Sequence, residues 1–165
     1  MEQNIRNNII ELATIYLNTD TFNEENTDEE PTKPNFTAFL YKELFNLDIE
    51  KSGYGLDPST KQMTNDLGDL KIYQEKDHNK IKYLTNIKPG DLLFFHTKSL
   101  DDQTPSPNNK YPGHVGIYTT NNNFIHLSPN TGKIIIETLT DNHLNTLVAS
   151  RDIIKYILTK NNISN

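Results

Sequence analysis

Residues 113–118 (GHVGIY), followed a few positions later by residues 124–126 (FIH), decide how this chain is best interpreted. Both stretches are short and rich in β-branched and aromatic residues, which is typical of β-strands. Side chains alternate between the two faces of a strand, so His114 and His126 meet only if both strands turn them to the same face. As residue types, they suit the base and the orienting group of a hydrolytic triad.

The turn between these two strands determines whether the imidazoles meet. A loop of three residues, 120–122 (TNN), places His126 on the same face as His114. A two-residue turn at Asn121 and Asn122 inverts every side chain of the second strand and separates the two rings. The sequence leaves both turns open.

The chain begins with helical patterns and continues with strand patterns. Apolar residues at helical spacing predict a helix over 4–17 and a second helix over 36–47, the latter with Asn35 as its N-cap. A short helix over 59–67 and a polar segment over 69–82 come next. Helices ahead of strands indicate an α+β fold, with the N-terminal helices packed on an antiparallel sheet. The sheet is predicted to have about five strands, over residues 91–95, 114–119, 123–127, 133–138 and 152–158.

The length of the chain suits one domain. Its 165 residues are enough for a single hydrophobic core, so we expect one domain over residues 1–165. Acidic residues gather at about 19–33, which predicts a solvated acidic loop. A second long loop is expected at about 97–112, where three prolines interrupt the strand patterns. Loops of that length are often functional or mobile.

Charge and hydropathy narrow the range of partners. With 16 Lys and Arg against 22 Asp and Glu, the net charge is −6 and no basic run is present, which disfavours nucleic acid. The longest apolar runs are far shorter than the ~20 residues that cross a bilayer. Residues 1–6 lack the features of a secretory signal. We therefore expect a soluble protein without a membrane span, either cytoplasmic or exported by a specialised route.

Residues 87–138 resemble the core of the NlpC-type family of cell-wall cysteine peptidases, which have a papain-like fold. Residues 87–95 (IKPGDLLFF) resemble the family strand with the pattern PGDL, and residues 113–118 resemble the strand that carries the catalytic histidine. Residues 124–126 resemble the strand that carries the third polar residue. Weaker similarity extends the resemblance over nearly the whole chain, at residues 9–17, 59–67 and 150–154.

The resemblance implies a particular chemistry. In an active relative a cysteine attacks an amide of a peptidoglycan stem peptide, and the residue at His114 acts first as base and then as acid. The residue at His126 orients the ring of that base. The family needs no cofactor or metal for this reaction, so we expect none here.

The chain departs from the family at the nucleophile, because it has no cysteine at all. Family members carry the cysteine at the start of the second helix, in the pattern DCSGF, where the positive helix end lowers the pKa of the thiol. The best register aligns residues 35–40 (NFTAFL) with that pattern, so that Phe36 occupies the nucleophile position. A shift by two residues places Ala38 there, the kind of residue used to disable a nucleophile. That shift moves the following apolar residues off the helix face, so Phe36 is favoured.

Two other chemistries use residues of the same regions. Thr37 could serve as an alcohol nucleophile, but it requires an aligned base within about 3 Å, and the resemblance directs His114 at the neighbouring position. His96, His114 and His126 could hold zinc with an open position. His96 lies beside the long loop and no HExxH motif is present, so a metal site is not favoured. His143 and His78 lie in polar surroundings and are expected at the surface.

Two functions follow from these observations. The first is a catalytically inactive relative that binds a peptidoglycan-derived peptide or a protein partner through the remains of the cleft. The second is a genuine peptide amide hydrolase whose cysteine was replaced by engineering, at Ala38 or Phe36. A third interpretation is an unrelated interaction domain with an accidental motif. The first two predict that His114 and His126 converge on the start of the second helix.

Overall fold

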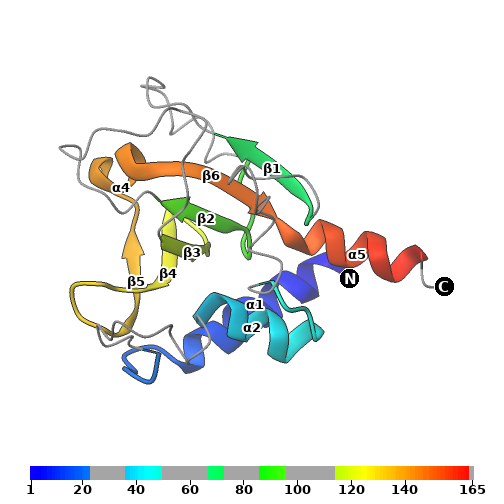
Figure 1. The fold of residues 1–165 in the computed structure, drawn as a ribbon, viewed down its shortest axis with the longest axis horizontal. Helices are drawn as coiled ribbons and strands as arrows, with labels where there is room; N and C mark the ends of the chain where they lie inside the picture. The colour runs from blue at the N-terminus through cyan, green and yellow to red at the C-terminus, as the bar shows by residue number, and fades with distance from the viewer. Residues whose placement is uncertain (23–35, 50–66, 73–85, 96–113, 164–165) are drawn as a thin grey trace, which may run out of the picture.

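The computed structural model describes residues 1–22, 36–49, 67–72, 86–95 and 114–163. Four helices and six strands are present in these ranges, and they confirm the α+β class (Figure 1). The helices are α1 (Glu2–Ile15), α2 (Phe36–Phe45), α4 (Asp141–Thr146) and α5 (Ile153–Ile163). The strands are β1 (Asp69–Ile72), β2 (Leu92–Phe95), β3 (His114–Tyr118), β4 (Asn123–Leu127), β5 (Ile134–Thr138) and β6 (Leu147–Asp152).

The strands form one antiparallel sheet in the order β1-β6-β2-β3-β4-β5. Strands β2 to β5 follow one another as a meander, as the sequence predicts. Strand β6 then returns to lie between β1 and β2, so the described sheet has six strands where about five were expected. The antiparallel sheet itself is confirmed.

Helices α1, α2 and α5 contribute to one hydrophobic core with the sheet. Side chains at alternate strand positions point into this core, including the fully buried Leu92, Ile117 and Ile125. They meet Ile9 of α1 and Leu40 of α2, which are also fully buried. Helices α1 and α2 lie together on one side of the sheet (Figure 1). Each such side chain stabilises the fold by about 1.5–3 kcal/mol relative to leaving it exposed.

The predicted closing strand over 152–158 is wrong. The last strand ends at Asp152, and α5 begins at Ile153. The Asp152 carboxylate accepts a hydrogen bond from the backbone N–H of Lys155 at 3.1 Å, which is the geometry of a helix N-cap. Ile153, Ile154 and Ile157 are buried at helical spacing, so the same apolar residues that suggest a strand form one face of a helix.

Two further elements were not predicted. Strand β1 lies within the polar segment over 69–82. It is an edge strand, and edge strands often carry exposed charged residues such as its Asp69 and Lys71, so the apolar pattern typical of a strand is missing. Helix α4 begins after Thr140, whose side chain and that of His143 form a capping box. The N-cap Asn35, the loop over 97–112, and most of the predicted helix over 59–67 and of the acidic loop over 19–33 lie outside the described residues. The single domain over 1–165 stays a prediction.

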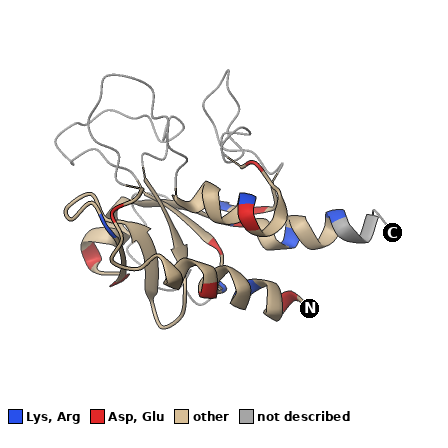
Figure 2. Cartoon of the chain, turned by 90° about the horizontal axis from the view of Figure 1, so that it is seen from below, with Lys and Arg blue, Asp and Glu red and all other residues tan. Residues whose placement is uncertain are grey.

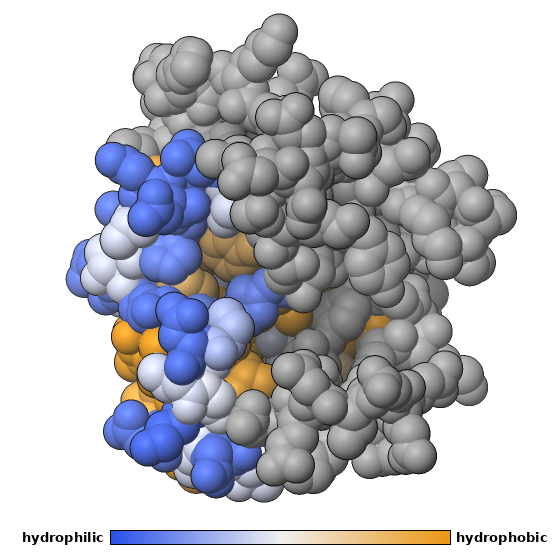
Figure 3. Space-filling model, turned by 60° about the vertical axis from the view of Figure 1, so that its left-hand side comes forward, coloured by the Kyte–Doolittle hydropathy of each residue, from blue (hydrophilic) through white to orange (hydrophobic). Residues whose placement is uncertain are grey.

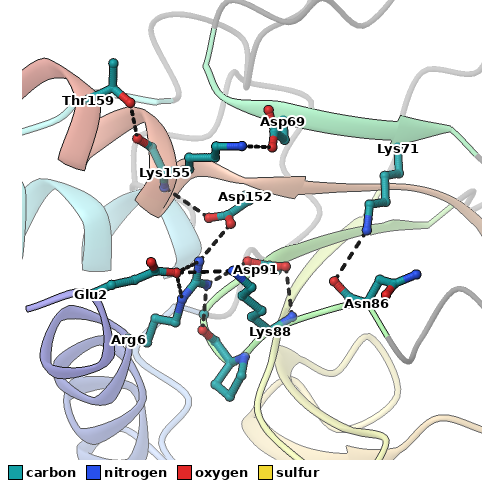
Figure 4. A network of polar contacts seen from close by, with 12 residues as sticks. Glu2, Arg6, Asp69, Lys71, Asn86, Lys88, Asp91, Asp152, Lys155 and Thr159 are labelled. Atoms are coloured by element: carbon teal, nitrogen blue, oxygen red, sulfur yellow. Dashed lines mark hydrogen bonds and ion pairs between the residues drawn. The ribbon is translucent and has the colours of Figure 1, made fainter.

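A buried arginine joins α1 to the sheet (Figure 4). Arg6 is 2% exposed, and its Nη1 donates to Asp91 Oδ1 at 2.9 Å while its Nη2 donates to Asp152 Oδ2 at 2.7 Å. The guanidinium also contacts the carboxylate of Glu2, one turn earlier in α1. Burial, and after it the charge of Asp152, raises the pKa of Asp91 to about 6. Arg6 therefore fixes α1 against the start of β2 and the junction between β6 and α5.

Charges of both signs are interspersed along the described helices and strands (Figure 2). No basic patch dominates this view, in keeping with the net charge of −6. Within the described ranges, no helix has both the length and the apolar character needed to cross a bilayer.

Candidate functional site

A three-residue turn joins β3 to β4. The backbone N–H of Thr119 donates to the carbonyl of Asn123 at 2.9 Å, which encloses residues 120–122 as the loop. Asn121 and Asn122 have φ angles of 54° and 62°, a left-handed conformation that asparagine adopts more readily than most residues. The backbone N–H of Asn123 also donates to the carbonyl of Thr120 at 2.9 Å, so Asn121 and Asn122 are the centre of a primed turn within this loop. The strand register, with Ile117 opposite Ile125 and Tyr118 opposite Phe124, leaves an odd number of residues between the strands and so places both histidines on the same face.

The two imidazoles meet directly. His114 Nε2 lies 2.7 Å from His126 Nδ1, and the ring centroids are 4.9 Å apart. Ile117 stands opposite Ile125 in the register of β3 and β4, and continuing that register by one residue sets Gly116 against His126. A Cβ at Gly116 would lie 2.8 Å from Phe124 Cδ2 and 3.4 Å from His126 Cβ. The missing side chain at Gly116 therefore leaves the space in which these rings pack.

Glu137 extends the pair into a chain of three groups. His126 Nε2 lies 2.7 Å from Glu137 Oε2, so the second histidine contacts His114 at one ring nitrogen and a carboxylate at the other. Glu137 is not among the site residues expected from the sequence. The signal available was an acidic residue within the predicted strand 133–138, but its pairing with the histidine strand depends on the register of the β4–β5 hairpin.

A third histidine reaches the same carboxylate from α4. His143 Nε2 lies 3.5 Å from Glu137 Oε2, and the backbone N–H of Thr140 donates to His143 Nδ1 at 3.0 Å. His143 is 28% exposed, in keeping with the surface position expected from the sequence, and it also contacts Glu137. Phe124 packs beneath these groups, with its ring centroid 4.4 Å from that of His126 and 5.0 Å from that of His143.

Both paired imidazoles are neutral at neutral pH. Burial, reinforced by the neighbouring His126, lowers the pKa of His114 to about 4. Burial also lowers the pKa of His126, although its hydrogen bond to Glu137 acts in the opposite direction. The contact between His126 and Glu137 is therefore a hydrogen bond from a neutral ring to a carboxylate rather than an ion pair.

The predicted convergence of these imidazoles on the start of the second helix stays a prediction, although α2 contacts the strands β3 and β4 that carry them. Phe36 begins α2 and is 2% exposed, and its ring packs against Tyr16 and Phe22 in the core on the helical side of the sheet. Ala38 belongs to that same core, and Thr37 is also buried in α2.

The imidazoles project from the other face of the sheet. The rings of His114 and His126 pack against Phe95 and Phe124, which belong to a second hydrophobic cluster. Strand alternation separates these residues from Ile117 and Ile125, which face the helices. The assignment of Phe36 to the nucleophile position stays a prediction, as do the roles of His114 and His126.

The described part of the chain contains no group of three or more histidine, cysteine or acidic residues arranged to hold a metal ion. His96, the remaining member of the zinc set considered from the sequence, lies outside the described residues.

On the side of the molecule turned forward in Figure 3, hydrophobic residues show between hydrophilic ones. Ile136 of the edge strand β5 is 45% exposed.

Helices packed on an antiparallel sheet, with a histidine pair on adjacent central strands, define the class of papain-like domains that the sequence resembles. The family model for the NlpC/P60 family matches residues 35–151, and the chain belongs to this family. This match rules out an unrelated domain with an accidental motif. No curated protein matches the chain.

Solved structures of similar fold include NlpC2 from Trichomonas vaginalis, with 19% identity and a TM-score of 0.49. The match covers 88% of this chain and 44% of NlpC2, so the chain spans less than half the length of that protein. The NlpC/P60 domain of the peptidoglycan hydrolase SagA has 16% identity and a TM-score of 0.47, with 89% of this chain and 97% of that domain covered.

Proposed function

We propose that this NlpC/P60 domain is catalytically inactive and acts by binding a peptide through the sheet face that carries His114 and His126. The observation that carries the proposal is the absence of cysteine from all 165 residues. Covalent amide hydrolysis of the family type needs a thiolate, and an imidazole pair cannot replace it as the attacking group. The expected ligand is a peptidoglycan-derived peptide, and a protein partner is the second choice.

The state of the imidazoles supports binding. Both rings are neutral at neutral pH, since burial lowers the pKa of each. A neutral imidazole carries one donor and one acceptor, and each can pair with a peptide group without the cost of burying a charge. Glu137 and His143 are 35% and 28% exposed, so polar groups of this array remain accessible to a ligand.

The alternative is a genuine peptide amide hydrolase from which the cysteine was removed at Ala38 or Phe36. The contact of 2.7 Å between His114 and His126 favours it, because a base and its orienting group are expected to make such a contact. The burial of both α2 positions argues against it. Ala38 and Phe36 are 5% and 2% exposed, and a thiol buried among apolar side chains has a raised pKa and low reactivity.

The decisive experiment restores a thiol. The variants Phe36→Cys and Ala38→Cys are assayed for release of amines from peptidoglycan fragments, with Phe39→Cys as a thiol control in the same helix. We expect no hydrolysis by any of the three. Hydrolysis by Ala38→Cys or Phe36→Cys, but not by the control, would establish the alternative.

Binding is tested separately on the unmodified chain. Isothermal titration with soluble stem peptides is expected to show saturable binding that weakens about tenfold in His114→Ala, the loss of roughly one good hydrogen bond. The exposed Lys133→Ala serves as the control variant and should bind as the unmodified chain does. If neither soluble stem peptides nor larger peptidoglycan fragments bind to the unmodified chain, the proposal that this face binds a peptide is refuted.

A further inference from the structure

We infer that Glu137 is a positioning residue, which holds His126 in the tautomer that leaves Nδ1 of His114 as a hydrogen-bond acceptor for an N–H group of the ligand. The inference deepens the proposed function, because it names the chemistry that His114 presents. The arrangement of protons, however, can be measured without any ligand.

The sheet register brings the three groups into line. Glu137 pairs with Phe124 across β4 and β5, and His126 pairs with Ile135, so Glu137 and His126 are diagonal neighbours on one face. The same relation holds between His126 and His114, because the register of Ile117 with Ile125, continued by one residue, sets Gly116 against His126. The contact distances of 2.7 Å at both nitrogens of His126 follow from this geometry.

The positions of the protons follow from the donor and acceptor properties of each group. A glutamate carboxylate only accepts hydrogen bonds, so the proton of His126 resides on Nε2, which faces Glu137. A neutral ring with its proton on Nε2 has a lone pair on Nδ1, and Nδ1 of His126 faces Nε2 of His114. His114 Nε2 therefore carries the donated proton. Its own Nδ1 is left as the acceptor.

Burial keeps His126 in this orientation. His126 is 5% exposed, and both of its nitrogens are engaged within the protein. The other tautomer sets the lone pair of His126 Nε2 against the carboxylate of Glu137, so two acceptors face each other, and a rotated ring loses its present partners. The packing of Phe124 against this ring opposes rotation further.

His143 holds the carboxylate from the other side. The backbone N–H of Thr140 donates to His143 Nδ1, so the proton of a neutral His143 resides on Nε2, which faces Glu137 Oε2 at 3.5 Å. Ring nitrogens of His126 and His143 thus face one carboxylate oxygen, from β4 at 2.7 Å and from α4 at 3.5 Å. The position of Glu137 is set by tertiary contacts rather than by its strand alone.

The consequence is selectivity for donors. A lone pair on a neutral ring, close to the negative charge of Glu137, favours a ligand that presents an N–H, either a peptide amide or an amino group. It disfavours a carboxylate at the same position, because two acceptors would face each other. This distinction identifies the peptide N–H, rather than its carbonyl, as the group that contacts His114.

The test measures tautomers directly. Long-range proton–nitrogen correlation spectra of the imidazoles are recorded at pH 7.5 for the unmodified protein, for Glu137→Leu, and for Glu43→Leu at an exposed position of α2 as a control. In the unmodified protein and the control we expect His114 and His126 as Nε2–H tautomers. In Glu137→Leu, the population of this tautomer at His126 should fall to roughly half, because the acceptor that selects it is gone.

Two results would overturn the inference. One is His126 of the unmodified protein as the Nδ1–H tautomer, which is decisive even if Glu137→Leu does not fold. The other is an unchanged His126 tautomer in a folded Glu137→Leu. Neither involves a ligand, so the failure of peptide binding in titration is a separate outcome that touches only the proposed function.

Discussion

Two polar networks in the described part of the chain differ in what holds them together. At the junction of α1 with β2 and β6, the permanently charged Arg6 is buried between Asp91 and Asp152. On the sheet face away from α1 and α2, His114, His126 and Glu137 form a chain in which both rings are neutral. The first network encloses the charged guanidinium of Arg6, which is shielded from solvent. The second is built on uncharged rings and has the partly exposed members Glu137 and His143, which suits recognition rather than stability.

The largest expected effect comes from removing the cation of the first network. In Arg6→Met, the buried Asp91 and the partly buried Asp152 lose their counter-charge, and we expect a loss of about 3–5 kcal/mol in the free energy of unfolding. Urea unfolding measures it, with the exposed Lys133→Met as control. A loss below about 1 kcal/mol would mean that the Arg6 network contributes little to stability. The two networks would then not differ in this respect.

The pH dependence of stability sharpens the comparison, because the two networks act with opposite signs. The pKa of His114 falls from 6.5 to about 4 on folding, so the unfolded chain binds the proton more tightly. Its contribution is therefore lost as the pH decreases through 6.5 towards 4, by an amount on the order of 3 kcal/mol. The pKa of Asp91 rises from 3.8 to about 6, so its contribution is present at low pH and is lost as the pH increases through 6.

Urea unfolding at pH 7 and at pH 4.5 separates these two effects. The variant His114→Gln has no imidazole at this position that takes up a proton on unfolding. Between pH 7 and pH 4.5, its free energy of unfolding should therefore decrease less than that of the unmodified chain. Parallel pH profiles for the two proteins would contradict the lowered pKa of His114.

A smaller loss of stability is expected from a substitution at Gly116. Gly116 makes no polar contact in the second network, but its missing side chain leaves room for the rings of that network. In Gly116→Ala the new Cβ meets Phe124 Cδ2 at 2.8 Å and the carbonyl oxygen of Ile125 at 3.3 Å, so neighbouring groups must move. We expect a loss of about 1–3 kcal/mol in unfolding free energy, together with displaced imidazole resonances of His126 in NMR spectra. Unchanged histidine resonances would show that the rings do not depend on this space.

The smallest expected effect concerns the cap of α4. Thr140→Ala removes the hydroxyl from the capping box and should cost about 1 kcal/mol, measured by thermal or urea unfolding. Thr14→Ala, at an exposed position of α1, is the control and should change stability by less than about 0.5 kcal/mol. Equal losses in both variants would mean that the cap does not fix α4, and with it His143, beside Glu137.

Local patterns predicted much of the fold. The helical spacing of apolar residues near the N-terminus predicts α1, which spans Glu2–Ile15. The strand patterns around the two histidines predict β3 and β4 within one residue at each end. The pattern failed at residues 152–158, because buried isoleucines in succession are compatible with a strand or a helix. The carboxylate of Asp152 decides in favour of the helix by capping it.

The candidate site could be predicted only in part. His114 and His126 were found because their strands carry a strong pattern, but their contact depended on the register of β3 with β4. Glu137 could not be found in the same way. Its strand is recognisable, but the hairpin register that sets it beside His126 depends on the β4–β5 pairing. The relation of Phe36 to the imidazoles was also beyond local patterns, because it depends on which face of the sheet α2 covers.

By itself, the sequence determined the α+β class, the helical and strand segments near the two histidines, the family and the absence of a thiol nucleophile. These follow from residue types and from periodicity along the chain, which act over a few neighbouring positions. Only the tertiary structure decided that the imidazoles share one face, that Glu137 and His143 join them, and that Phe36 packs in the core on the other side. Those relations depend on strand register and on helix packing, which are set by contacts between residues far apart in the chain.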